Sequence, residues 1–236
     1  MTGSSMTASP TAPAPAAVTL QVWRVPARRV PSAVVASQLT VRSLRGRNDV
    51  SFAKVLGTAS AAFLPTAITP RRWATLACWR QQPAKLVTWF DRHADERASL
   101  TLRPLSSRGH WDRREPFGTP AADVTAPDDV PILVLTRSTL RLTRARRFYR
   151  AIPPIAEELQ KATGCRVAFG IGEAPLRRQG TVSLWTSAAA MTAFAYGAPH
   201  HRAAITDTPG ERWYAEELFT RFAVVEATGS IDGVAL

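Results

Sequence analysis

The sequence predicts an α+β protein in which two halves of similar design close into one barrel. Two observations lead to this prediction: an order of strands and helices that repeats after a Pro- and Asp-rich segment, and apolar patterns that suit strands and helices in turn. Each half has the order β-α-β-β-α-β of a ferredoxin-like unit. Because a single four-stranded sheet leaves one face uncovered, two tandem repeats are expected to pair into a fused α/β barrel within the chain.

The N-terminal repeat is expected over residues 18–117 and the C-terminal repeat over residues 132–236. Apolar residues alternate in the expected strands and recur at about 3.6-residue spacing in the expected helices. The first repeat has expected strands at 18–25, 50–56, 73–79 and 99–105 and helices at 32–44 and 84–94. The second has expected strands at 132–138, 166–171, 181–185 and 220–227 and helices at 188–196 and 144–161, the latter broken at Pro153 and Pro154.

Two segments differ in composition from the rest of the chain. Residues 1–17 are rich in Ser, Thr, Pro and Ala and lack an apolar core, so a disordered tail is expected. Residues 118–131 are rich in Pro, Asp and Ala, which is typical of a linker. No segment has the pattern of a secretory signal, and no apolar stretch reaches the roughly 18 residues of a membrane span. With two cysteines, Cys78 and Cys165, in no paired spacing, we expect a cytoplasmic protein.

The chain is strongly basic. Its 30 Lys and Arg against 18 Asp and Glu give a formal charge of +12. Such a field attracts anionic membrane surfaces, and we expect a peripheral attraction of this kind. The arginines are spread along the whole chain without a helix-turn-helix, zinc-finger or ribonucleoprotein motif, so nucleic acid is not the expected partner.

Two of the four histidines, His200 and His201, are adjacent and follow an apolar helix. Imidazoles in such a position can ligate a metal or a haem iron. The residues alone leave open that both are surface residues after the break at 197–199. His93 has a similar place in the first repeat and is a rival ligand.

Several short sequence motifs follow one another along the chain in an order that is specific when they are taken together. They are 104–111, Leu135–Arg141, Gly170–Pro175, Thr181–Trp185, and His201 standing four residues before Ile205. As a set they resemble the spheroidene monooxygenase family, haem-associated oxygenases that place a keto group on an acyclic carotenoid. The resemblance covers most of the chain after residue 18 and is densest from Leu135 onward. It implies a monooxygenase that acts on a hydrophobic or specialised-metabolite small molecule.

The resemblance also implies a haem b cofactor. Because the chain has no Cys-x-x-Cys-His motif, covalent attachment is not expected. The family's histidine precedes a small-small-Ile turn, and because His201 has that spacing to Ile205, the resemblance implies His201 rather than His200 as the axial ligand of the iron. The oxidant would be dioxygen or peroxide, and the electron donor stays open.

Candidate partners for the haem propionates are arginines in the matching segments, because a guanidinium meets a carboxylate at two points. These arginines are Arg108, Arg137 and Arg141; the alternative is that each is solvated at a strand end. Gly170 and Gly172 flank Ile171 in a way that suits a flat ligand pressing on backbone.

Two residues are candidates for catalytic roles. His110, in a Gly-His-Trp turn, is a candidate hydrogen-bond donor to bound oxygen or substrate, and Glu173 is a candidate proton-relay acid. A surface position is the alternative for both. Glu216 and Glu217, taken as helical, are not expected to pair, since adjacent side chains on a helix diverge.

Two other classes of function stay open. One is a haem lyase similar to aldoxime dehydratases, which would act on a nitrogen-containing substrate. The other is a non-catalytic haem-binding α/β-barrel protein. The sequence does not fix the substrate or the oligomeric state, and fold alone does not decide the reaction.

Overall fold

The computed structural model describes residues 14–83, 87–118, 120, 127, 129–174, 177–203, 206 and 212–236. Most of the predicted tail and linker, and the residues Pro175 and Ile205, lie outside these ranges. Within the described residues, no helix is both long and apolar enough to cross a membrane.

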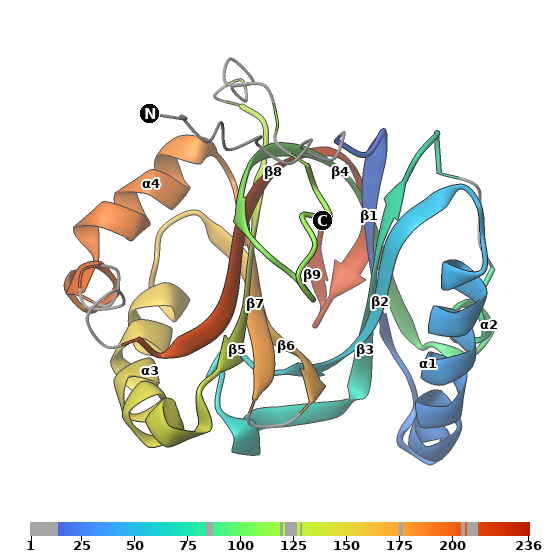
Figure 1. The fold of residues 1–236 in the computed structure, drawn as a ribbon, viewed down its shortest axis with the longest axis horizontal. Coiled ribbons are helices and arrows are strands. Elements are labelled where there is room, and N and C mark those ends of the chain that lie inside the picture. The colour runs from blue at the N-terminus through green and yellow to red at the C-terminus, as the bar shows by residue number, and fades with distance from the viewer. Residues whose placement is uncertain are drawn as a thin grey trace, which may run out of the picture.

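The described strands form a closed antiparallel barrel, as predicted from the sequence (Figure 1). Eight described strands follow one another around the barrel in the order β4-β1-β3-β2-β6-β7-β5-β8, and β8 pairs with β4 to close it. Their bounds are Ala17–Arg24 (β1), Val50–Ala59 (β2), Ile68–Trp79 (β3), Glu96–Gly109 (β4), Ile132–Leu140 (β5), Cys165–Ala174 (β6), Arg178–Trp185 (β7) and Tyr214–Ile231 (β8). A short strand β9, Val234–Ala235, turns back onto the end of β8.

The helices lie outside the barrel on two opposite sides (Figure 1). Helices α1 (Val30–Arg45) and α2 (Trp89–His93) cover one side, and α3 (Ala145–Gln160) and α4 (Ala188–Gly197) cover the other. Short 3-10 turns, Ala27–Arg29 and Leu142–Arg144, precede α1 and α3. The order strand-helix-strand-strand-helix-strand therefore occurs twice along the chain.

The barrel interior is packed with side chains. Alternate residues of every strand point inward, for example Leu20 on β1 and Leu133 on β5, and an eight-stranded barrel is just wide enough for such side chains to fill. Two further segments enter the interior. Trp111 and Phe117 come from the segment after β4, and Ile231 comes from the C-terminal hairpin, whose strand β9 lies within the barrel outline in Figure 1.

Three expected elements differ from the structure. Helix α3 runs through Pro153 and Pro154 without the predicted break. Each proline removes one backbone N–H donor, but Phe148 before them and Ala156 and Leu159 after them are buried, and this packing of one helix face outweighs the lost hydrogen bonds. The expected helix at 84–94 is described only as α2, with residues 84–86 outside the described ranges. Residues 214–219 belong to β8, which is 18 residues long, so Glu216 and Glu217 are not helical as taken from the sequence.

Candidate functional site

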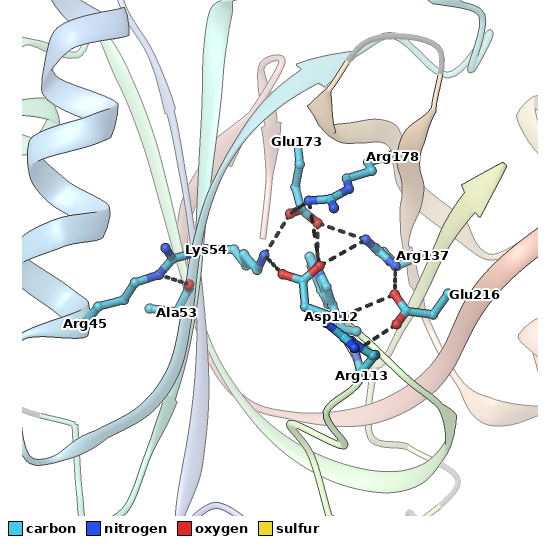
Figure 2. Close-up of polar contacts among 10 residues, drawn as sticks. Arg45, Ala53, Lys54, Asp112, Arg113, Arg137, Glu173, Arg178 and Glu216 are labelled. Carbon is cyan, nitrogen blue, oxygen red and sulfur yellow. Dashed lines mark hydrogen bonds and ion pairs between the residues drawn. The ribbon is translucent and has the colours of Figure 1, made fainter. Parts of the chain in front are cut away.

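Four charged side chains point into the barrel from four different strands. They are Lys54 on β2, Arg137 on β5, Glu173 on β6 and Glu216 on β8. Lys54 follows Phe52 and precedes Leu56 at alternate positions whose side chains face the interior. The side chains of Lys54 and Arg137 are only 7% and 2% exposed. Buried charges of this kind must be paired, and the structure shows their partners (Figure 2).

The partners include a tight turn after β4, Trp111–Arg114, which we call the inner turn. Asp112 and Arg113 both have positive φ, an unusual conformation for residues other than glycine. Lys54 Nζ contacts Asp112 and lies 2.7 Å from Glu173 Oε2. The backbone N–H groups of Asp112 and Arg113 donate to the Glu216 carboxylate at 3.1 and 2.8 Å. Trp111, fully buried, donates its indole N–H to Glu173.

Arg137 connects these groups. It contacts Glu216 directly and lies 3.5 Å from Glu173 and 3.6 Å from Asp112. Arg178 approaches the same two carboxylates, Glu173 and Asp112, at 3.9 and 3.8 Å. We call the set of Lys54, Asp112, Arg137, Glu173, Arg178 and Glu216 the inner cluster. Its three cations balance its three carboxylates, which is the condition under which buried charges are tolerated.

The cations of the inner cluster favour ionised carboxylates. Burial by itself raises the pKa of Asp112, but the hydrogen bond and charge of Lys54 and the charges of Arg137 and Arg178 together outweigh burial, and the pKa lies below its ordinary value. The pKa of Glu216 is also lowered, because the N–H groups of Arg113 and Asp112 and the charge of Arg137 outweigh the effect of burial. The inner cluster therefore holds the inner turn in place as a set of fixed ion pairs.

An open cleft of about 630 Å³ lies beside the inner turn. Its described lining is Gly109, His110, Arg113, Arg212, Tyr214, Ala215, Glu216 and Glu217. His110 is exposed there, with Nε2 3.5 Å from Glu115. Glu216 belongs to both the cleft and the inner cluster, so the predicted residues His110, Glu173 and Arg137 lie at the same end of the barrel.

A second group of residues lies on the outer face of the sheet, under α3 and α4. Its buried members are Ile132, Val134, Leu159, Trp185 and Met191, and partly buried apolar side chains around them include Phe63, Leu105, Phe194 and Phe219. We call this the outer cluster. Ile132 and Val134 point outward where Leu133 and Leu135 point into the barrel, so the two clusters lie on opposite faces of the sheet.

His201 lies at the edge of the outer cluster. Its ring is 4.7 Å from that of Phe194, which is 5.2 Å from Trp185. Nδ1 bonds the carbonyl oxygen of Ala195 at 3.3 Å. Burial lowers the pKa of His201 despite the Ala195 bond and the charge of Glu158, so the neutral imidazole is favoured.

The neighbouring His200 has a different environment. It is exposed, and its Nδ1 is 2.7 Å from Glu158 Oε1. Both histidines donate their backbone N–H to the Glu158 carboxylate at 3.1 Å. In the first half, His93 stacks on Trp89 at 4.4 Å with Nδ1 2.8 Å from the Trp89 carbonyl oxygen. In the aromatic cluster there, Trp23 and Phe90 are almost fully buried, and Trp73 and Trp89 are partly buried.

The remaining predicted residues lie on both faces. The Arg108 guanidinium lies 5.3 Å from the ring centre of Phe219, in the outer cluster. Arg141 is exposed and donates Nε–H to the Tyr214 carbonyl oxygen at 3.0 Å. A Cβ on Gly170 would meet Ala59 at 3.0 Å and Phe63 at 3.6 Å, so side chains of the chain itself press on this glycine. A Cβ on Gly172 would meet the Arg178 carbonyl oxygen at 3.5 Å.

Sequence reasoning missed Lys54, Asp112 and Glu216 as partners of Glu173 and Arg137. A lysine between Phe52 and Leu56, at a position where the alternation calls for an apolar residue, was the available signal. Asp112 and Glu216 carried no such signal. Among the described residues, no three His, Cys, Asp or Glu side chains are placed to hold a metal ion together.

Solved structures show which class of fold this is. Aldoxime dehydratase superposes with a TM-score of 0.57 at 12% identity, covering 91% of this chain and 84% of that chain. Aldoxime dehydratase in complex with butyraldoxime superposes with a TM-score of 0.56 at 12% identity, covering 88% of this chain and 79% of that chain. The chain is therefore an α/β-barrel protein of the kind seen in these enzymes, and at this identity the likeness concerns the fold alone.

Sequence comparison identifies the family. No model of a known protein family matches the chain. The chain is 34% identical over 198 residues to spheroidene monooxygenase of Rubrivivax gelatinosus, covering 80% of this chain and 73% of the relative. It is 33% identical over 203 residues to spheroidene monooxygenase of Rhodobacter capsulatus, covering 83% of this chain and 84% of the relative. The chain belongs to the spheroidene monooxygenase family. It is an enzyme of the oxidoreductase class, a monooxygenase, as the sequence predicted.

Proposed function

We propose that this monooxygenase binds haem b against the outer cluster, with His201 as the axial ligand, and oxidises a hydrophobic small molecule. Spheroidene, the compound in the names of the relatives, is the first substrate to test. When bound, haem supplies the activation of dioxygen or peroxide, and the protein supplies binding, orientation and exclusion of water.

The observation that carries the haem proposal is the environment of His201. A carbonyl oxygen only accepts hydrogen bonds, so contact with Ala195 places the proton on Nδ1 and leaves the lone pair on Nε2. Within the described residues, Nε2 has no hydrogen-bond partner. A neutral imidazole whose second nitrogen is held by a carbonyl is the usual form of an axial histidine.

The outer cluster suits a planar apolar ligand. Phe194, whose ring contacts that of His201, is only partly buried, as are Phe63, Leu105 and Phe219, so part of the apolar surface of the outer cluster stays exposed. For the propionates we propose Arg108, which lies over Phe219, and Arg141. Arg137 points into the barrel and is already bound to Glu216, which favours a role in the inner cluster.

The other predicted residues receive more limited proposals. Because Gly170 has no side chain, Ala59 and Phe63 can pack against its backbone, and we assign it a role in shaping the sheet surface next to the outer cluster. Gly172 lies on the same strand, β6, and we assign it the same role. His110 is proposed as a donor to ligands in the open cleft. Glu173 accepts from Trp111, Lys54 and Arg137, an arrangement that favours a positioning role over proton transfer.

The arrangement of strands supports the proposal of tandem ferredoxin-like repeats at 18–117 and 132–236, joined by 118–131. The first half orders its strands β4-β1-β3-β2, and the second orders the corresponding strands β8-β5-β7-β6. Both cysteines are free thiols, which accords with the proposed cytoplasmic location.

Reconstitution with hemin tests the cofactor, and isotope labelling tests the reaction. We expect a sharp Soret band at one haem per chain. Turnover of spheroidene should require dioxygen with a reductant, or peroxide, and ¹⁸O₂ should label the product when dioxygen is the oxidant. An aldoxime dehydratase-like lyase would instead convert a nitrogen-containing substrate such as an aldoxime without oxygen, and its product would carry no ¹⁸O from ¹⁸O₂. A non-catalytic haem protein would bind hemin and convert neither compound. Either result would overturn the proposed reaction while leaving the haem site intact.

A further inference from the structure

The outer face of α1 has an unusual composition. The side of α1 that packs on the sheet is built from small and polar residues with one large one, namely Ala33, Ala36, Ser37, Thr40 and Leu44. The opposite side exposes Val34, Val35 and Leu39, which are 49%, 61% and 61% accessible. An ordinary surface helix has the reverse distribution, with its larger aliphatic residues toward the core and polar residues outside.

Arginines flank this apolar surface at both ends. Arg28 and Arg29 lie in the turn that precedes α1, and Arg42 and Arg45 lie in its last turn. All four are exposed, and Arg45 also donates to the Ala53 carbonyl oxygen at 3.4 Å (Figure 2). Residues 14–48 contain no Asp or Glu. Among described residues, no carboxylate pairs with Arg28, Arg29 or Arg42.

We propose that this surface, formed by Arg28, Arg29, Val34, Val35, Leu39 and Arg42, docks onto an anionic phospholipid bilayer. A helix with aliphatic residues between arginines lies in the plane of the interface, with the aliphatic side chains among the acyl chains and the guanidinium groups at the lipid phosphates. The proposal goes beyond the proposed function and does not depend on haem.

Charge favours a bilayer over two other occupants of the surface. A second copy of the chain related by a two-fold axis would bring the arginines of α1 against their own copies, with no acidic residue on α1 to offset the repulsion. Nucleic acid would satisfy the arginines but leave Val34, Val35 and Leu39 beside phosphates. An anionic bilayer satisfies both the charged and the aliphatic side chains.

The test compares variants on two sides of the barrel. Arg28→Gln, Arg29→Gln and Arg42→Gln together remove three charges from the α1 surface. Arg144→Gln, Arg146→Gln and Arg150→Gln remove three exposed charges at α3, which lies on the opposite side in Figure 1. Val35→Ser with Leu39→Ser removes the aliphatic contact, and Ile68→Ser with Leu142→Ser is its control, since these residues are 53% and 63% exposed elsewhere.

Binding is measured by sedimentation with vesicles of equal parts phosphatidylcholine and phosphatidylglycerol, at physiological salt. Each arginine at an anionic surface raises the partition coefficient onto the vesicles about five-fold, so this coefficient should fall about a hundred-fold in the α1 triple variant. In the serine variant at Val35 and Leu39 the partition coefficient should fall at least about ten-fold. Both controls should stay close to the parent protein, and vesicles of phosphatidylcholine alone should bind weakly.

Insertion is measured separately with an environment-sensitive dye on Gln38→Cys in a Cys165→Ser background. Its emission should shift to the blue on adding the anionic vesicles, and a dye on Arg150→Cys should not respond. Equal losses in the α1 and α3 triple variants would show binding by net charge alone and overturn the proposal. So would a parent dimer that the serine variant converts to a monomer, or a preference for single-stranded RNA over the vesicles.

Discussion

At the scale of single residues, His201 and His93 show how similar local geometry leads to different expectations. Both rings lie beside an aromatic residue and direct Nδ1 to a carbonyl oxygen. Both clusters keep partly buried aromatic side chains, Trp73 and Trp89 in the cluster next to His93 and Phe194 and Phe219 in the outer cluster next to His201. The resemblance of the segment that begins at His201 to the spheroidene monooxygenase family, rather than the surroundings of the ring, favours His201 as the ligand.

We therefore predict that His201→Ala lowers haem affinity by at least about a hundred-fold, because the axial bond is lost. His200→Ala and His93→Ala should retain near-parental affinity. Titration with hemin, followed at the Soret band, gives the affinities. Added imidazole should restore the spectrum of His201→Gly if only the ligand is missing. Loss of haem in His200→Ala with retention in His201→Ala would move the ligand to His200.

Glu216 gives a prediction on pH. Glu216→Gln leaves Arg137, which is 2% exposed, without its direct carboxylate, and we expect a loss of about 3 kcal/mol in the free energy of unfolding near pH 7. The pKa of Glu216 is lowered in the folded state, so its contribution is complete above the ordinary glutamate pKa of about 4.3 and is lost as pH falls through the lowered folded value.

Urea unfolding of the parent and of Glu216→Gln at several pH values measures this difference. The difference in free energy of unfolding between the two proteins should be constant near neutrality and should become smaller in acid. Glu217→Gln is the matched control, because Glu217 is the exposed neighbour on the same strand. A gap that widens in acid would contradict the sign of the linkage.

At the scale of elements, the turn after β4 depends on Gly109. Its φ is +87°, and a Cβ there would lie 2.1 Å from the Glu217 carbonyl oxygen. Gly233 has a similar φ of +80° but nothing within 4 Å of its Cβ position. We predict that Gly233→Ala costs about 1 kcal/mol for the backbone strain alone. Gly109→Ala should lower the melting temperature more than Gly233→Ala does, because β4 and β8 must separate to make room for the added methyl group. Equal losses in the two variants would show that contact with β8 is unimportant.

The same scale shows how far the sequence alone predicts the structure. Alternation located most strands within a few residues, for example Thr181–Trp185 within β7. It failed for the start of β8, since Glu216 and Glu217 together interrupt an apolar pattern and the inward direction of Glu216 depends on pairing with β4 and β5. Contacts between Lys54, Asp112 and Glu173 depend on closing the barrel, and a single sequence carries no information on register between distant strands.

At the scale of the whole molecule, the sheet separates two sets of candidate functional side chains. The inner cluster fixes the inner turn at one end of the barrel, and the outer cluster with His201 lies under α3 and α4. Strands β5 and β8 contribute to both, through Arg137 and Glu216 on one face and Val134 and Phe219 on the other. Within the described residues, His201 and the inner cluster share no hydrogen-bond or ion-pair partner.

This separation predicts additive effects. His201→Ala should change haem affinity while leaving the melting temperature of the haem-free protein nearly unchanged, and Glu216→Gln should do the reverse. For the double variant without haem, the loss in free energy of unfolding should equal the sum of the single losses within about 0.5 kcal/mol, as for sites without shared partners. Haem affinity of the double variant should match that of His201→Ala. A larger deviation in either quantity would show that the two faces of the sheet are coupled, and that the inner cluster supports the proposed haem site.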